Sequence, residues 1–338
     1  MRRPTDLPPD VRHLLAVGDD LVRRRDLLAL GVPRSTLTRL VRQESLVSLA
    51  NGVYTDPATV AALGPWPLLR LRTRALLMVS PPNTYAADWS AVVVHDLPTP
   101  GEPPAVPSVL RPRSCRSGSN RTINGRTRFA AVPDTWLGDH HGVASVQPAF
   151  AAVDIGRRAG RLASLIVADA VAARDHGRDS LIAALQDIDG WSGAGRASWA
   201  VRHCDPDVES PLESAGRLAF IRGGLPPART NEWVGEHLPV FRLDHYWPEQ
   251  RVGAEADGLR KYLSDPAATI RQEKEREWRL QRMGIRVIRY GWAVAVGSPD
   301  LLAHRVRELL AAPPLPPGQL LTWSNRDGRA LRGLGRPA

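Results

Sequence analysis

The first part of the chain alternates apolar and polar positions with a helical period. Residues 11–22 have apolar side chains at near-helical spacing, which predicts an amphipathic helix. A second short helix is expected to end at Gly31, because glycine tolerates the left-handed backbone that closes a helix. A third is expected over residues 34–44, because Pro33 can open a helix but cannot continue one. The apolar stripe of this third helix consists of Leu37, Leu40 and Val41.

Two β-rich runs follow within residues 45–55 and flank Asn51-Gly52, a strong signal for a tight hairpin. Helix, short turn, helix and hairpin is the order of a winged helix-turn-helix. The helix before the hairpin then carries polar side chains that can reach phosphates and base edges in a major groove. These predicted DNA-binding residues are Arg34, Ser35, Thr38, Arg39 and Arg42. The alternative is a small helical cap with a solvated basic face.

The stretch GVPRSTLTRLVRQESLVSLANGVYT resembles the winged-helix N-terminal domain of AbiEi-type antitoxins, which belong to type IV toxin–antitoxin systems. The resemblance covers about residues 12–56 and implies binding to duplex DNA, often at the protein's own promoter. The chain departs from this pattern at the wing tip, Leu49-Ala50-Asn51-Gly52, which has no basic residue to hold the DNA backbone.

The middle of the chain, residues 59–205, is expected to mix helices and strands and has no recognisable chemical motif. Helices are predicted over residues 68–79 and 151–173, and residues 88–95 fit a strand or a buried helical turn. Arginines cluster in residues 111–128, where they fit equally a phosphate-tracking patch or a charged sheet edge. This region weakly resembles the linker region of the same antitoxin-like proteins.

From residue 207 onward the pattern predicts helix, strand, strand, helix, strand and helix. The first helix opens at Ser210, and Gly284 ends the long one. The expected strands are residues 240–247, 251–257 and 285–290, and the two later helices are residues 267–283 and 299–310.

Acidic side chains stand on the two adjoining strands. Residues two apart on a strand share a face, so Glu255 and Asp257 are expected side by side, next to Asp244 on the hairpin partner. Three carboxylates that converge without cations repel one another and shift their pKa values. A hard divalent cation, Mg²⁺ or Mn²⁺, resolves that repulsion, which makes these three acids the predicted metal ligands. The alternative is the solvated polar face of an amphipathic strand.

The segments SPLES, LDHYWPEQRVGAEADG and MGIRVIRY resemble the PD-(D/E)xK nuclease superfamily, and within it small proteins related to very-short-patch-repair endonucleases. The resemblance covers about residues 207–295 and implies a metal-dependent cut of a phosphodiester bond. It matches Asp244 to the first metal-binding aspartate and Glu255 to the acid of the second strand. It also matches Asp257 to the position two beyond that acid, and Glu213 to the acid on the opening helix.

The chain departs from the nuclease pattern at two points. The superfamily's lysine is replaced by Asp257, and the histidine that commonly follows E-x-D-G is absent. Lys261 or Arg260, just past the strand, is the candidate substitute for the lysine, and Lys261 is therefore included among the predicted catalytic residues.

Other residues of this segment have two interpretations each. Glu213 stands three residues after Ser210 and so also completes a capping box. Arg276 and Arg279 are expected to face DNA or to brace the acidic site. Trp247 and Trp278 are expected in the core rather than as stacking platforms for bases.

Composition adds one strong signal, which is charge. The 338 residues include 45 Lys+Arg against 35 Asp+Glu, for a net charge of +10 and a sequence pI of about 10.6. That balance favours a polyanionic partner such as double-stranded DNA. Only Lys261 and Lys274 are lysines, so the excess is arginine, which a GC-rich genome also produces.

Several classes of protein are excluded. A hydrophobic content of 43% argues against wholesale disorder, and no apolar run reaches the ~18 residues of a membrane span. The N-terminus lacks the apolar region of a secretory signal. Two cysteines, Cys115 and Cys204, make neither a disulfide framework nor a cysteine-based zinc site, so a reducing cytoplasm is expected.

We therefore expect an α/β protein, α+β overall, with four parts. These are a winged helix (1–58), a middle α/β linker domain (59–205), a restriction-endonuclease-like α/β domain (206–311) and a disordered basic tail (312–338). The favoured hypothesis is a DNA-binding protein with an Mg²⁺-dependent endonuclease domain. The alternative is a non-catalytic regulator or antitoxin with a degenerate nuclease-like domain. A cognate toxin and a second copy of the chain are further candidate partners.

Overall fold

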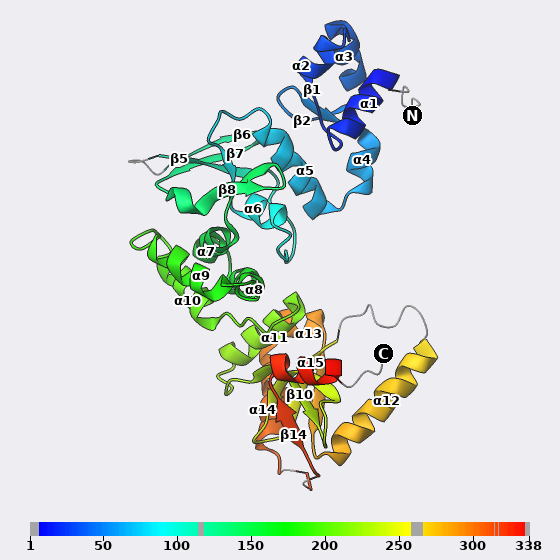
Figure 1. Cartoon of the computed structure of the whole chain (residues 1–338), viewed down its shortest axis with the longest axis vertical. Coiled ribbons are helices and arrows are strands. Elements are labelled where there is room, and N and C mark those ends of the chain that lie inside the picture. The colour runs from blue at the N-terminus through cyan, green and yellow to red at the C-terminus, as the bar shows by residue number, and fades with distance from the viewer. Residues whose placement is uncertain (1–6, 114–117, 258–265, 314, 317, 335–338) are drawn as a thin grey trace. The chain divides into compact units, whose positions relative to one another are not determined.

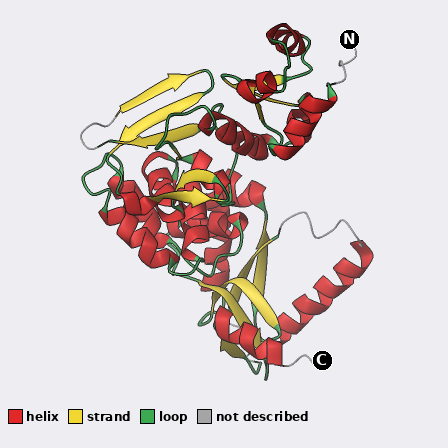
Figure 2. Ribbon diagram, turned by 45° about the horizontal axis from the view of Figure 1, so that its top comes forward, coloured by secondary structure: helices red, strands yellow, loops and turns green. Residues whose placement is uncertain are grey.

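The computed structural model describes residues 7–113, 118–257, 266–313, 315–316 and 318–334. The chain forms two compact units. The N-terminal unit holds residues up to 159 together with 179–198, and the C-terminal unit holds 160–178 and 199 onward. Helices and strands are mixed in both, so the fold is α/β, α+β overall (Figures 1 and 2). The boundaries at residues 58, 205 and 311 stay predictions.

The N-terminal unit begins with three helices and a three-stranded antiparallel sheet of order β1-β3-β2. The elements are α1 (Pro9–Val17), β1 (Val22–Arg23), α2 (Arg24–Ala29), α3 (Arg34–Arg42), β2 (Val47–Ala50) and β3 (Val53–Thr55). The first helix ends earlier than predicted, because Asp19 and Asp20 adopt positive φ of 48° and 69° and the chain turns into β1. The helices bury one apolar cluster that includes Val11, Leu27 and Leu37.

A six-stranded sheet of order β6-β7-β5-β4-β9-β8 forms the rest of this unit. Its strands are β4 (Tyr85–Ala86), β5 (Ser108–Pro112), β6 (Gly118–Thr122), β7 (Gly125–Ala130), β8 (Leu137–His140) and β9 (Val143–Val146). The accompanying helices are α4 (Pro57–Ala62), α5 (Pro65–Leu77), α6 (Trp89–Val94), α7 (Pro148–Arg158), a 3₁₀ turn (Asp134–Trp136) and most of α9 (Gly177–Gln186).

Two expectations for the middle of the chain change. The single helix predicted over residues 151–173 is broken, because Ala159 and Gly160 have extended backbones between α7 and α8. The arginine cluster also divides, since Arg128 is buried against Asp154 while β6, at the sheet edge, is exposed along its whole length.

The C-terminal unit is built on a five-stranded sheet of order β13-β12-β11-β10-β14. Its strands are β10 (Arg229–Gly235), β11 (Phe241–Trp247), β12 (Val252–Ala256), β13 (Arg286–Tyr290) and β14 (Leu321–Trp323). Its helices are α8 (Arg161–Ala172), the end of α10 (Ala194–His203), α11 (Pro211–Arg222), α12 (Pro266–Arg282), α13 (Trp292–Gly297), α14 (Pro299–Ala311) and α15 (Asn325–Leu334). In this sheet β12 and β13 run parallel, and the other strand pairs that the structure describes here are antiparallel.

Two apolar clusters cover opposite faces of this sheet. Trp247 and Ala254 pack with α11, α13 and α14 in one cluster, while Tyr246 packs with Leu280 of α12 in the other. The prediction that Trp247 is core is confirmed at 2% exposure, whereas Trp278 is 52% exposed and the same prediction for it is wrong. The Arg282 guanidinium lies 4.9 Å from the centre of the Trp278 ring on the same helix.

The prediction of a disordered tail from residue 312 is wrong for the residues that the structure describes there. β14 pairs antiparallel with β10, with Trp323 opposite Trp233, and α15 packs on β10, where Gly328 lies against the Trp233 ring. The physical reason is that β10 would otherwise be an open sheet edge. A β10 strand was itself not predicted, because its residues alternate poorly.

Candidate functional site

The exposed face of α3 is the first candidate site. Leu37 and Leu40 are buried, and this stripe turns the polar residues of the helix outward. The five predicted DNA-binding residues, Arg34, Ser35, Thr38, Arg39 and Arg42, are all exposed. Among the residues that the structure describes, the three arginines of this face have no ion-pair partner. The face is therefore positively charged and open to solvent.

The predicted hairpin lies directly after this helix. β2 and β3 pair antiparallel, and Gly52 turns the chain with φ of 76°, a conformation that glycine adopts without strain. The backbone N–H of Arg24, at the start of α2, donates to the Gly52 carbonyl oxygen at 2.8 Å. The hairpin tip is thus attached to the helices that precede it.

The second candidate site is a pocket of about 230 Å³ on the C-terminal sheet. The three predicted metal ligands, Asp244, Glu255 and Asp257, all line it. The reason is strand register. His245 of β11 is opposite Ala254 of β12 in an antiparallel pair, so the neighbouring residues Asp244 and Glu255 come next to each other at the end of that pair. The remaining charged lining residues are Arg242, Glu273, Arg276 and Arg289.

Arginines hold the central acid of this pocket. Arg276 of α12 donates two hydrogen bonds to the Glu255 carboxylate, one of them at 2.7 Å between Nη1 and Oε2. Arg289 of β13, directly opposite Glu255 across the parallel pair, has its Nε 3.6 Å from Glu255 Oε2 and its Nη1 3.0 Å from Glu273 Oε2. Burial lowers the pKa of Arg289, but Glu273 and Glu255 outweigh it and raise the pKa above the ordinary value.

This donor set does not fit Mg²⁺ or Mn²⁺ as it lies. Carboxylate oxygens are the right chemistry for either ion, but Glu255 is engaged by two guanidinium groups, and Asp244 Oδ2 accepts the Ala256 N–H at 2.8 Å. Within the described ranges, no three acidic, histidine or cysteine side chains are grouped so that they could hold a metal ion. The three acids therefore share a pocket without forming a coordination shell.

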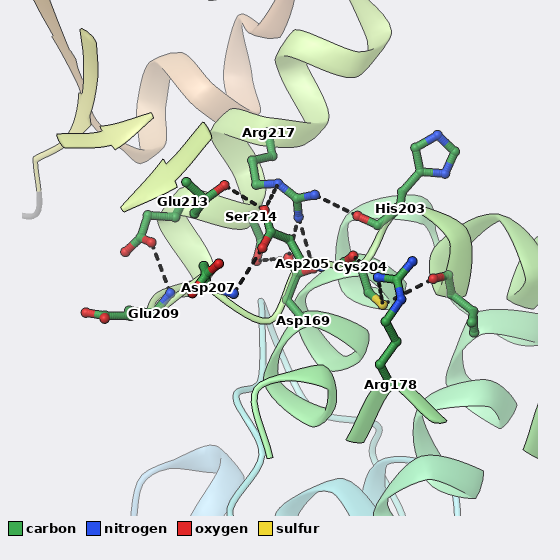
Figure 3. A network of polar contacts seen from close by, with 12 residues as sticks. Asp169, Arg178, His203, Cys204, Asp205, Asp207, Glu209, Glu213, Ser214 and Arg217 are labelled. Atoms are coloured by element: carbon green, nitrogen blue, oxygen red, sulfur yellow. Dashed lines mark hydrogen bonds and ion pairs between the residues drawn. The ribbon is translucent and has the colours of Figure 1, made fainter. Parts of the chain in front are cut away.

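Glu213 lies outside that pocket, buried on α11 (Figure 3). Its N–H donates to Ser210 Oγ at 3.2 Å, and its Oε2 accepts the N–H of Glu209 at 3.0 Å and Nδ2 of Asn231 at 2.9 Å. The capping interpretation is confirmed, with the difference that the returned bond goes to Glu209 rather than to the N-cap residue itself. Burial raises the pKa of Glu213 above its usual range.

The basic residues predicted near the acidic pocket differ in where the structure places them. Lys261, and Arg260 beside it, lie outside the described residues. Arg276 braces the acidic site, one of its two expected roles, whereas the Arg279 guanidinium lies 4.8 Å over the Phe241 ring.

Some residues of the candidate sites, among them Arg242, Arg289, Glu273 and Arg24, were not predicted. Arg242 and Arg289 line the acidic pocket, and strand alternation could have indicated Arg242, two residues before Asp244. Arg24 contacts the hairpin tip across 28 residues of sequence, and no local pattern indicates such a contact.

Comparisons with known proteins add little to this description. No protein-family model matches the chain, and no curated protein matches it. Among solved structures, the chain is similar to the crystal structure of the RV2827C protein from Mycobacterium tuberculosis, at 17% identity over 63% of this chain and 82% of that chain, with a TM-score of 0.39. A similarity this low supports no statement about function. Across the described residues, every helix is too short or too polar to cross a bilayer.

Proposed function

We propose that this protein binds double-stranded DNA through a winged helix-turn-helix at its N-terminus, with α3 in the major groove. The observation that carries the proposal is the exposed polar face of α3, where Arg34, Arg39 and Arg42 stand without carboxylate partners among the described residues. A guanidinium left without a counterion is an available donor for phosphate oxygens and for guanine edges.

The surrounding elements support the same proposal. Helix, turn, helix and hairpin follow in the order that places a recognition helix beside a wing. The excess of basic residues over the whole chain favours a polyanion. A small helical cap with a solvated basic face, the alternative interpretation, has the same composition but predicts no saturable binding to DNA.

Removing two of the three arginines of this face tests the proposal. We expect the Arg34→Ala/Arg39→Ala variant to bind duplex DNA about 100-fold more weakly, because two arginine contacts to base edges or phosphates are lost. The measurement is fluorescence anisotropy with a labelled duplex from upstream of the protein's own gene. The matched control is Arg25→Ala/Arg305→Ala, which removes the same charge from exposed positions outside α3. Equal affinity of the two variants contradicts the proposal.

Metal-dependent phosphodiester hydrolysis is a second candidate function. One observation favours it: Asp244, Glu255 and Asp257, from two paired strands, line one pocket. The ion pairs of Glu255 with Arg276 and Arg289 oppose it, since a cation needs that carboxylate released. These ion pairs favour the regulator or antitoxin hypothesis instead. In that hypothesis the same pocket belongs to a degenerate, non-catalytic domain and a toxin is the partner.

Asp244→Ala separates these two functions. If the pocket is a nuclease site, the wild type nicks supercoiled DNA in Mg²⁺ or Mn²⁺ and Asp244→Ala lowers the rate by about 100-fold or more, because a ligand to the reacting centre is removed. Asp300→Ala, an exposed acid on α14, is the control. Calorimetric titration of Mg²⁺ into the wild type and Arg276→Gln adds a readout independent of cleavage, since Arg276→Gln removes one of the two guanidinium groups that hold Glu255. Absence of both cleavage and Mg²⁺ binding rejects the nuclease.

A further inference from the structure

We propose that a groove beside α3 binds a backbone phosphate of duplex DNA, and that Arg24 supplies a cation to it from outside the recognition helix. This inference rests on the proposed DNA-binding function and adds a specific phosphate site to it. The groove has a volume of about 440 Å³ and is lined by Arg24, Arg34 and Arg42 with Leu37, Thr38, Val41 and Tyr54.

The charge of the groove is of one sign. Three guanidinium groups line it and no carboxylate does, as far as the described residues reach. A concave surface with an apolar floor, formed here by Leu37 and Val41, concentrates the field of such charges. An anion is the complementary occupant. The Thr38 hydroxyl also lines the groove and donates to the Arg34 carbonyl oxygen at 2.9 Å.

Arg24 differs from the arginines on either side of it. Arg23 pairs with Asp26 at 2.8 Å and Arg25 with the same carboxylate at 3.5 Å. Arg24 has no carboxylate partner among the described residues, and its Nη2 donates only to Tyr54 Oη, at 3.4 Å. It is therefore the member of this basic run that is available to a ligand.

The fold places Arg24 beside the hairpin tip. Its N–H bonds to the Gly52 carbonyl at 2.8 Å, and a Cβ added at Gly52 would lie 3.5 Å from the Arg24 Cβ. The hairpin tip itself, Leu49-Ala50-Asn51-Gly52, has no basic residue. Arg24 thus provides, from α2, the cation that the wing lacks.

The polar face of α3 then divides into two parts. Arg34, Thr38 and Arg42, spaced four residues apart, line the groove, whereas Ser35 and Arg39 do not. With the groove against the DNA backbone, Ser35 and Arg39 are left for base edges. Removing a groove arginine should weaken binding to every sequence alike and should reduce its salt dependence.

The test is the salt dependence of binding to a 30-base-pair duplex of random sequence, measured by anisotropy in the full-length protein. We expect Arg24→Ala to lower the slope of log K against log [NaCl] by about 1, because one phosphate contact releases about one counterion. Arg34→Ala is expected to do the same. Arg25→Ala, at the neighbouring exposed position, is expected to leave the slope unchanged.

Two further variants separate charge from a structural role of Arg24. Arg24→Lys keeps the charge and is expected to keep the slope, and Tyr54→Phe removes only the hydrogen bond and is expected to keep it as well. A wild-type slope in Arg24→Ala, while Arg34→Ala loses about 1, overturns the groove inference and leaves the proposed function intact. Loss of slope in Tyr54→Phe equal to that in Arg24→Ala also overturns it. Absence of salt-dependent binding by the wild type rejects the proposed function itself.

Discussion

The Asp154→Ala variant is expected to lose about 3 to 5 kcal/mol of stability in the N-terminal unit. Asp154, on α7, is 1% exposed, and Arg128 of β7 is 3% exposed. Arg128 donates two hydrogen bonds to the Asp154 carboxylate, one at 3.0 Å, and Arg157 and Arg158 donate at 2.9 and 3.1 Å. Without Asp154, the buried Arg128 guanidinium loses the carboxylate to which it donates both of these hydrogen bonds.

The electrostatics of Asp154 support this expectation. Burial raises the pKa of Asp154, but Arg128 and the two other arginines outweigh burial and hold the pKa below its ordinary value. The charged form is therefore favoured in the folded unit. The lowered pKa means that this carboxylate contributes to stability at neutral pH and that its contribution is lost on acidification.

Urea unfolding followed by hydrogen exchange of the α7 amides measures this loss, because a chain of two units need not unfold in one transition. Asp134→Ala, an exposed acid of the same unit, is the control and should change stability by less than about 0.5 kcal/mol. The Asp154→Ala/Arg128→Met variant should be more stable than Asp154→Ala alone, since it also removes the unpaired charge. If the α7 amides of Asp154→Ala keep the wild-type protection against hydrogen exchange, the prediction is wrong.

A second large effect is expected from acid titration of the C-terminal unit. Complete burial, with a smaller contribution from Arg217, lowers the pKa of His245 from 6.5 to about 3. His245 Nε2 lies 2.6 Å from Tyr290 Oη inside the core. The unfolded chain binds a proton here below pH 6.5 and the folded unit does not, so stability falls as the pH drops from 6.5 towards 3. Between pH 7 and pH 5 the loss is about 2 kcal/mol.

Asp169 opposes this effect in the same unit (Figure 3). Burial raises its pKa from 3.8 to about 6, although Arg217 and Ser214 act to lower it. Ser214 Oγ donates to Asp169 Oδ2 at 2.7 Å, and Arg217 Nη1 donates to Oδ1 at 3.0 Å. The folded unit takes up the proton first, so this group adds about 1 kcal/mol between pH 7 and pH 5. The wild type alone should therefore show only a weak pH dependence.

Variants that remove one group at a time expose the two opposing effects. Between pH 7 and pH 5 the free energy of unfolding of the wild type should fall by about 2 kcal/mol relative to that of His245→Phe/Tyr290→Phe. For Asp169→Asn the shift should be about 1 kcal/mol in the opposite direction. His304→Gln, at an exposed histidine of α14, is the matched control. If the stability difference from wild type does not change with pH for either core variant, the prediction is wrong.

The two candidate sites were predictable to different extents. The exposed residues of α3 were predicted correctly because exposure on a helix depends on apolar residues within one or two turns, here Leu37 and Leu40. The shared pocket of Asp244, Glu255 and Asp257 was predicted because strand alternation and a short hairpin are also local. In both cases the relevant partners lie within about a dozen residues.

Errors occurred where a distant segment decides the environment of a residue. The tail became ordered because β14 pairs with β10, some 90 residues earlier by sequence position. Trp278 was predicted to lie in the core, but its side chain is 52% exposed on α12. Arg289 holds Glu255 only because β13 adds in parallel beside β12.

The amino-acid sequence by itself determined the helix, turn, helix and hairpin of the N-terminus, the basic outward face of α3 and the strand positions of the three acids. Local periodicity and turn chemistry specify these features, and both are readable within a few residues. The tertiary structure alone decided that Arg24 lies at the hairpin tip and that Arg276 and Arg289 pair with Glu255 in the C-terminal pocket. Such contacts join residues tens of positions apart, and their geometry arises only when the core packs.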